Sequence, residues 1–302
     1  MSPNPTSKQV ARRLVVGALA LAATAATTAT SAHADKKKRP PTVAEQVEAR
    51  LYDLLTTIEY TAPTRFVFHL ANDFLVDPKP GTELTEHEVG FWVIKGKATA
   101  AVAADGQAVI YAADLGWAEP CGDETCPKVP RPDGIYRVTA VLDGKAPWTA
   151  LAWHLGRPIT GKDQKAAIAA GERPRPLPRR IGKGAEAAVA VFEASIGDPR
   201  ALARTVSART DVVLYGSGAS ERYVGGAKVA ATLGRWNLTF KVRDGLQAGV
   251  TRSGTVAWVA ANLDATSAKK PGAATPYRAM FVYERHVDQW QLVQAHFSFP
   301  SD

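Results

Sequence analysis

The sequence predicts an α+β protein with two tandem domains, each a curved, mostly antiparallel mixed sheet packed on N-terminal helices. Both halves begin with apolar residues at helical spacing and end in several β-rich segments. QAVIYAADL at residues 107–115 matches TVAWVAANL at 255–263, with a glycine just before each. Both halves close on a strand–turn–strand pattern that carries an arginine and a histidine, at residues 136–154 and 277–298. The chain therefore reads as a duplication.

Shifts in composition set the expected domain boundaries. The stretch GERPRPLPRRIGKG is too rich in Pro, Gly and Arg for a core element, so it indicates a solvated linker. Docking of an acidic partner on its charges is the alternative. We expect the following parts: a signal peptide at 1–34, a basic tail at 35–40, a divergent first domain at 41–160, the linker at 161–184 and the second domain at 185–302.

The N-terminal residues predict export. Lys8, Arg12 and Arg13 form a basic region, Leu14 to Leu21 an apolar one, and Ala32-His33-Ala34 a small-x-small cleavage site. The apolar run is too short for a stable membrane anchor. Cleavage after Ala34 would release a periplasmic or secreted protein. Twin-arginine and general secretory export both fit this pattern.

The net charge of +8 does not indicate nucleic-acid binding once it is located. The predicted signal contains three of the 37 Lys and Arg residues and no acid, which leaves 34 against 29. The basic tail holds four more basic residues and one acid, which leaves 30 against 28. A nearly neutral body offers no basic groove, so we expect no nucleic-acid partner.

The two cysteines, Cys121 and Cys126, lie in the loop EPCGDETCPKVP. In an exported chain such close cysteines favour a small disulfide loop. A metal site with Asp123 and Glu124 is the weaker alternative, because no second Cys/His pair lies nearby. The sequence contains no Gly-rich phosphate loop, nucleophile elbow or metal-ligand cluster, so we expect no metal and no cofactor.

The first copy is expected to open on a capping box, Thr42 to Glu45, before a helix that reaches Ile58. Its further elements are a short helix at 64–71, a strand at 73–76 and strands at 89–95, 98–103, 107–115, 135–142 and 148–155. In the second copy, Asp198-Pro199 predicts an N-cap with Pro at N1. Its elements are helices at 185–196, 199–207 and 227–233, and strands at 211–215, 237–243, 245–252, 255–264, 277–285 and 289–298.

This order resembles the SnoaL-like branch of the nuclear-transport-factor-2-like superfamily. In the second copy the resemblance lies in DVVLYGSGASERYVGG before a helix, in GTVAWVAANL, and in the Tyr277-Arg278 strand followed by WQLVQAHFS. The first copy departs from the pattern between Asp77 and Lys97. The resemblance implies cone-shaped domains, in which a curved sheet wraps around helices and encloses a pocket. The family includes isomerases, dehydratases, cyclases and binding modules, so it does not fix the function.

The closing hairpin predicts one specific pair of residues. With a turn centred at Val287, Arg278 would lie directly opposite His296, and an Asp143-Gly144 turn would likewise bring Arg137 close to His154. The resemblance implies that the concave face of these strands lines the pocket. The candidate ligand-binding residues are Arg278, His296, Ser298, Tyr215, Trp258 and Asn262 in the second copy, and Arg137, His154 and Asp114 in the first.

Each candidate also has a structural explanation, as a core anchor, a hydrogen-bonded buried histidine or an arginine paired with an internal carboxylate. One difference between the copies bears on the choice. Asp114 aligns with Asn262, so Arg278 would lack the internal anion that Arg137 has. An unpaired buried guanidinium is costly, which favours an anionic ligand in the second copy.

The function favoured by the sequence is non-catalytic binding of a small, partly apolar ligand. The first alternative is a small-molecule isomerase, dehydratase or cyclase, with His296 as base and Arg278 stabilising an oxyanion. The second alternative is a structural or assembly module, because cones of this family often pair through their sheets. The two copies would then form an internal pseudo-dimer, or the chain a homo-oligomer.

Overall fold

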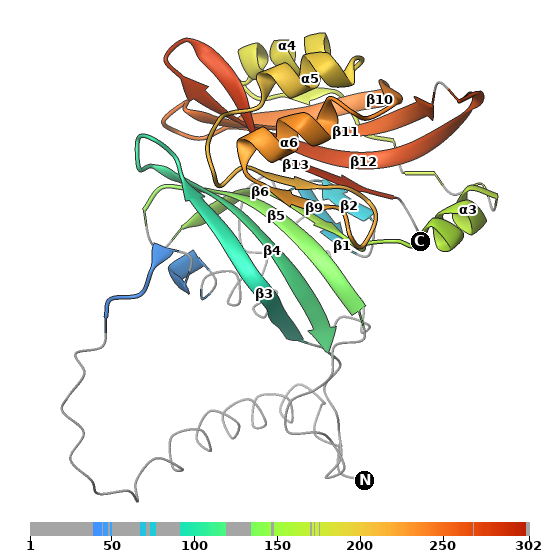
Figure 1. The fold of residues 1–302 in the computed structure, drawn as a ribbon. Coiled ribbons are helices and arrows are strands. Elements are labelled where there is room, and N and C mark those ends of the chain that lie inside the picture. Colours follow the sequence, from blue (N-terminus) through green and yellow to red (C-terminus); the bar gives the residue numbers. More distant parts are fainter. Residues whose placement is uncertain are drawn as a thin grey trace, which may run out of the picture. The chain divides into compact units, whose positions relative to one another are not determined.

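Two antiparallel meanders of four long strands dominate the computed structural model (Figure 1). The structure describes residues 39–43, 45–47, 49, 67–70, 73–76, 91–118, 134–145, 148–169, 171, 173–174, 176–267 and 269–299. Residues Pro41–Asp302 make up one compact unit. The predictions for the signal peptide, Cys121 and Cys126 lie outside the described residues.

The C-terminal sheet has seven strands in the order β7-β10-β11-β12-β13-β8-β9. Its meander is followed on one edge by the short strand β7 and on the other by β8 and β9. The strands are β7 (Arg180–Ile181), β8 (Val213–Tyr215), β9 (Arg222–Val224), β10 (Leu238–Val250), β11 (Val256–Ser267), β12 (Lys270–His286) and β13 (Gln289–Ser298). Three helices pack on one face: α4 (Glu186–Ser195), α5 (Pro199–Thr205) and α6 (Gly226–Leu233) (Figure 1).

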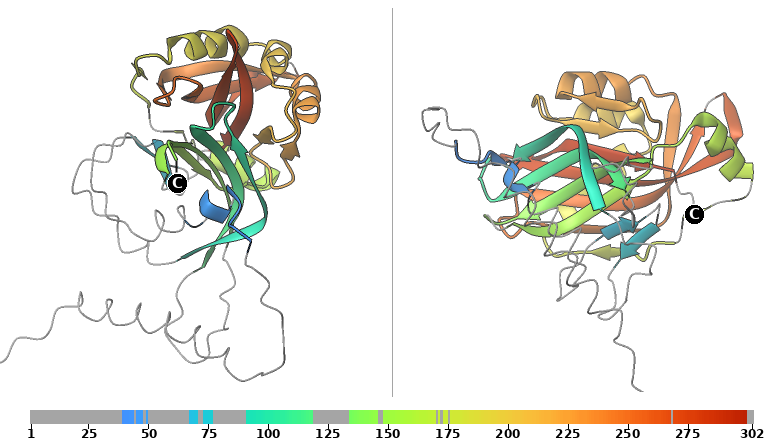
Figure 2. Two further views of the ribbon diagram at one scale, coloured as in Figure 1. Left: turned by 90° about the vertical axis from the view of Figure 1, so that its left-hand side faces the viewer. Right: turned by 90° about the horizontal axis from the view of Figure 1, so that it is seen from below.

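The N-terminal sheet has the order β3-β4-β5-β6. Its strands are β3 (Phe91–Val102), β4 (Ala108–Ala118), β5 (Gly134–Asp143) and β6 (Thr149–Gly156). A separate hairpin pairs β1 (Val67–Leu70) with β2 (Asp73–Val76). Figure 2 shows this sheet and the C-terminal sheet from two further sides, with the helices α4 to α6 lying against the C-terminal sheet.

The mixed α+β class with antiparallel sheets is confirmed, and most strands lie where the sequence predicts them. The predicted capping box is present, since Thr42 N donates to Glu45 Oε2 at 2.7 Å and Glu45 N donates to Thr42 Oγ1 at 3.3 Å. Asp198 caps α5 by accepting from Arg200 N, with Pro at N1. Local signals of this kind survive folding because their partners lie within one turn.

Three predictions for local elements are wrong. The segments 89–95 and 98–103, expected as two strands, form the single strand β3, with a register shift between Lys95 and Thr99. The helix expected at residues 64–71 is absent, because Val67–Leu70 is strand β1, paired with β2. The segments 237–243 and 245–252, expected as two strands, form the single strand β10. A register shift between Val242 and Leu246 replaces the expected break. Cross-strand pairing of this kind is a tertiary effect that local propensity does not report.

The segment predicted as a linker contains helix α3 (Gly161–Ala169) and strand β7. Between them runs an ordered strap, residues 176–179. Leu177 is 5% exposed and packs with residues from both sheets, including Ile110 and Trp258. Its N–H donates to Asp244 Oδ1 at 3.3 Å, and its carbonyl accepts from Gly245 N at 2.9 Å. The strap is therefore part of the core.

Most of the buried apolar side chains that the structure describes belong to three large clusters. The first lies between α4–α6 and the C-terminal sheet and includes Phe192, Phe281 and Phe297. The second lies between the two sheets, where Ile110 and Val141 meet Met280 and Val282. The third lies on the other face of the N-terminal sheet and includes Trp148 and Trp153. Within the part of the chain that the structure describes, no helix has the length and hydropathy of a membrane span.

We predict that Gly245→Ala dislodges the strap. A Cβ at Gly245 would overlap the Leu177 carbonyl oxygen and approach Arg179 N to 2.5 Å, so the backbone must shift. The expected loss is about 1–3 kcal/mol in the free energy of unfolding, measured by urea denaturation. Gly161→Ala is the control, because a Cβ there meets nothing within 4 Å and Ala favours the helix. Equal stability of the two variants would contradict the role given to the strap.

Candidate functional site

The β12–β13 hairpin turns at Val287, as expected, and Val287 has a positive φ of 54°. Its register differs from the expected one, because Arg278 lies opposite Ser298 and His296 lies opposite Met280. The turn has two central residues, which shifts the pairing by one, and a bulge between Val282 and Tyr283 shifts it by one more. A shift of two keeps both side chains on the same face but makes them diagonal neighbours.

The face on which Arg278 and His296 lie is also not the expected one. Ala279 and Phe281 pack with Phe192 of α4, so odd positions of β12 face the helices. Met280 and Val282 pack with side chains of the N-terminal sheet, so even positions face that sheet. Arg278 and His296 therefore point away from the helix-covered side and into the layer between the two sheets, which we call the seam.

Two histidines stack on each other in the seam. The rings of His154 and His296 have centroids 4.1 Å apart and planes 14° apart, and the residues are 0% and 1% exposed. His154 Nε2 lies 2.9 Å from Ser298 Oγ, and His296 Nδ1 lies 3.2 Å from Thr139 Oγ1. Each imidazole from one sheet thus has a hydroxyl partner from the other.

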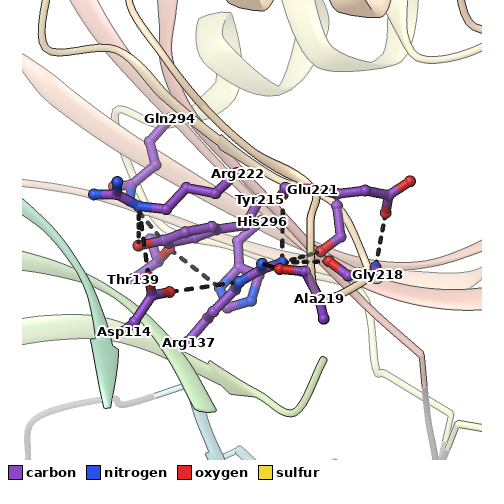
Figure 3. Close-up of polar contacts among 11 residues, drawn as sticks. Asp114, Arg137, Thr139, Tyr215, Gly218, Ala219, Glu221, Arg222, Gln294 and His296 are labelled. Carbon is purple, nitrogen blue, oxygen red and sulfur yellow. Dashed lines mark hydrogen bonds and ion pairs between the residues drawn. The ribbon is translucent and has the colours of Figure 1, made fainter. Parts of the chain in front are cut away.

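Thr139 and Gln294 extend this network (Figure 3). Gln294 Nε2 donates to Thr139 Oγ1 at 3.1 Å and to the Tyr111 carbonyl at 3.4 Å. Because the Thr139 hydroxyl already accepts from Gln294, it can donate its own proton to His296 Nδ1. The arrangement therefore fits a neutral His296 ring that carries its proton on Nε2.

Arg137 binds the turn between β8 and β9. Its Nη1 donates to the carbonyls of Gly216 at 2.9 Å, Gly218 at 2.9 Å and Glu221 at 3.3 Å. Its Nη2 donates to the Ala219 carbonyl at 2.6 Å. A single guanidinium from the N-terminal sheet thus satisfies four carbonyls of one loop in the C-terminal sheet (Figure 3). This use of Arg137 is structural.

Asp114 and Tyr215 complete the surroundings of Arg137. Asp114 Oδ1 lies 3.5 Å from Arg137 Nε, and Asp114 Oδ2 lies 3.8 Å from Arg222 Nε. The Arg137 guanidinium lies 5.0 Å from the centre of the Tyr215 ring, a cation–π distance. Burial, together with the Asp114 carboxylate, raises the pKa of Tyr215 to about 12, so its phenol stays protonated.

The remaining candidates also lie on the seam side of the C-terminal sheet. Arg278 Nε donates to Asn262 Oδ1 at 3.4 Å, and Asn262 Nδ2 donates to Asp244 Oδ2 at 3.1 Å. Asn262 thus links the buried Arg278 to the carboxylate of Asp244. The alignment of Asp114 with Asn262 gave no indication of this carboxylate. Trp258 belongs to the apolar part of the seam with Met280.

The electrostatics of the seam disfavour acid–base chemistry. Burial, with a further contribution from Arg278, lowers the pKa of His154 to about 3. His296 is 1% exposed and stacked, so its ring has no open face for a substrate. Among the described residues, no group of three or more His, Cys, Asp or Glu side chains could hold a metal ion. The arrangement can bind the two sheets together, and neither of its two histidines is accessible as a base.

Sequence reasoning missed several residues of the seam. Thr139 shares a face with Arg137 by strand alternation, which was the available signal for it. Gly156 carries no such signal, yet a Cβ there would lie 2.7 Å from Ser298 Cβ and 3.0 Å from His296 Nε2. The carbonyls that bind Arg137 belong to the backbone of a polar loop, so no side-chain pattern could have identified them.

We predict that Arg137→Met destabilises the protein by about 2–4 kcal/mol, because four carbonyls of the β8–β9 loop lose their donor, the buried carbonyl of Gly216 among them. Urea denaturation measures the loss, and hydrogen exchange at Gly218 should become faster as the loop loosens. Arg200→Met is the control, since Arg200 is exposed on α5 and the change should stay within about 0.5 kcal/mol. A similar loss in both variants would show that the loop does not depend on Arg137.

The C-terminal part of the chain matches a known family. Residues 189–302 match the model of the SnoaL-like domain. No curated protein matches the sequence.

Several solved structures are similar to part of the chain, each with low sequence identity. A candidate ketosteroid isomerase from Parabacteroides distasonis is 20% identical, with 37% of this chain and 84% of that one covered and a TM-score of 0.31. A candidate dehydratase of the NTF2-like family from Streptomyces avermitilis is 22% identical, with coverages of 39% and 92% and a TM-score of 0.31.

A nuclear transport factor 2-like superfamily protein from Salmonella enterica is 14% identical, with coverages of 47% and 95% and a TM-score of 0.30. No activity of this chain follows from such similarities. The family match thus identifies a SnoaL-like domain at residues 189–302 of this chain.

Proposed function

We propose that the N-terminal sheet is a second, divergent copy of the SnoaL-like domain. The registers of the two meanders support this. Each first strand shifts register at one bulge, between Lys95 and Thr99 in β3 and between Val242 and Leu246 in β10. The last hairpins shift alike, after Val141 and after Val282. Equal registers at bulged positions are hard to obtain from unrelated sheets, because each bulge depends on its own local sequence.

The equivalent residues of the two meanders also meet across the seam. Arg137 pairs with Asp114 as Arg278 pairs with Asn262, and His154 lies opposite Thr139 as His296 lies opposite Met280. These correspondences make His154 the counterpart of His296. Stacking of two counterparts on each other is the contact expected at a pseudo-two-fold axis.

The turns at the far ends of the sheets exchange contacts in the same way. Ala104 N donates to Glu284 Oε1 at 2.7 Å, and Arg252 N approaches Asp143 Oδ2 at 3.4 Å. Asp143 and Glu284 occupy equivalent register positions, opposite Ala108 and Val256. Each copy therefore offers a carboxylate to the β-turn of the other, as in an isologous dimer interface.

The proposed function is a non-catalytic structural module, in which the first copy is the permanent partner of the second. The observation that carries this proposal is the use of the candidate pocket residues. Arg137, His154, His296 and Ser298 bind the opposite half of the chain and are at most 3% exposed. His296 as a general base would need access to substrate, and the small-ligand alternative would need donors that the seam already uses.

We predict that native mass spectrometry at micromolar concentration shows the intact protein as a monomer with no bound small molecule. The seam covers internally the faces that could otherwise pair between chains. Denaturation of the same sample should release no organic compound. A retained ligand that is lost in Arg278→Ala would restore the anion-binding interpretation, and a homodimer would contradict the internal pairing.

We also propose export with cleavage after Ala34, which the sequence of residues 1–34 alone supports. The mature chain recovered from the periplasm or medium of a producing bacterial cell should begin at Asp35, as read by intact mass. Replacing Arg12 and Arg13 with lysine separates the two export routes, because only the twin-arginine route should fail. A chain that keeps Met1 in the cytoplasm would contradict export.

A further inference from the structure

Two imidazole rings in contact form the centre of the seam, one from each sheet. His154 and His296 are fully buried and stacked, and their hydrogen bonds go to hydroxyls of the opposite sheet. Stacked neutral imidazoles attract each other, whereas a charged ring pays a large desolvation cost in such a place. Burial and stacking therefore favour the unprotonated form of both rings.

The charged groups around the histidine pair further disfavour protonation of either ring. Arg137 of β5 and Arg278 of β12 are buried guanidiniums, 3% and 1% exposed. Tyr215 of β8 meets His296 edge-on at 5.2 Å. On β4, Asp114 is engaged by Arg137 and by Arg222 of β9. Protonation of His154 would thus add a cation near the charged Arg278, while the Asp114 carboxylate is already engaged.

We propose that the histidine pair is an acid-sensitive lock, and that proton uptake favours a state in which the two sheets part at the seam and the rings reach water. This goes beyond the proposed pairing of two copies. It depends on the contacts in the seam and would stand even if the sheets were not a duplication.

The direction and the pH range of the opening follow from proton linkage. The pKa of the buried His154 is lowered to about 3, first by burial and then by Arg278, whereas an exposed histidine titrates near pH 6.5. Between about pH 3 and pH 6.5, His154 is protonated in the open state and unprotonated in the closed state. The closed state is fully favoured above about pH 6.5, and the opening equilibrium should rise about tenfold per pH unit below it for each such ring.

Two backbone amides report opening of the seam directly. Ile159 N donates to the Ser217 carbonyl at 2.9 Å, and Ala104 N donates to Glu284, so both bonds join the two halves. Val189 N in the first turn of α4 donates to the carbonyl of the N-cap residue Ala185 and is the internal reference. Hydrogen exchange read by NMR at pH 7 and pH 5, corrected for intrinsic rates, should show at least tenfold more opening at Ile159 and Ala104 at pH 5, with Val189 unchanged.

Matched variants assign the effect to the rings. His154→Phe combined with His296→Phe keeps two flat rings but removes the protonation sites, so the pH dependence at Ile159 should disappear. His286→Phe changes an exposed histidine and should leave the dependence intact. Equal opening of the wild type at both pH values, or an unchanged dependence in the double variant, would overturn the proposal.

Ring titration in the wild-type protein covers the case in which the double variant does not fold. Imidazole NMR signals should show both seam rings unprotonated in the closed state at pH 5. A seam ring that titrates near pH 6.5 without any increase in opening would equally reject the lock.

Discussion

Two sheets that pack face to face must find partners for the polar groups that they bury, and this constraint organises the seam. The partners come from the opposite sheet: hydroxyls for the histidines, carbonyls for Arg137 and carboxylates for the two β-turns. An unpaired group would cost about 1–3 kcal/mol, so the two halves are mutually required. The polar contacts of the seam therefore fix how the two sheets align, in addition to the apolar packing between them.

The loop between β8 and β9 shows how far this dependence reaches. Ile159 forms a parallel bridge with Gly218, and Arg137 holds the carbonyls on the same loop. Both residues come from segments far away in sequence. The strap inserts Leu177 into the seam and leads directly into β7, which pairs with β10. A chain segment that joins two independent domains would not need such contacts, which is why the halves are best regarded as one cooperative unit.

The meanders, their turns and the helix caps could be predicted because they depend on neighbours in sequence. Alternation in β12 and β13 correctly placed Arg278 and His296 on one face, since a two-residue register error preserves the face. The helix expected at 64–71 failed because pairing with β2 overrides local propensity. The sequence did not predict the bulges either, because an extra residue in one strand can be recognised only against its partner strand.

The sequence by itself determined which residues alternate, which segments pair as hairpins and which residues the two meanders share. It could not determine what lies on each face of a sheet, because alternation distinguishes two faces without saying which one the helices cover. Tertiary structure decided this, and it turned His154 and His296 toward each other. The physical reason is that the hydrogen bonds across the seam join residues 144 and 157 positions apart, beyond any local pattern.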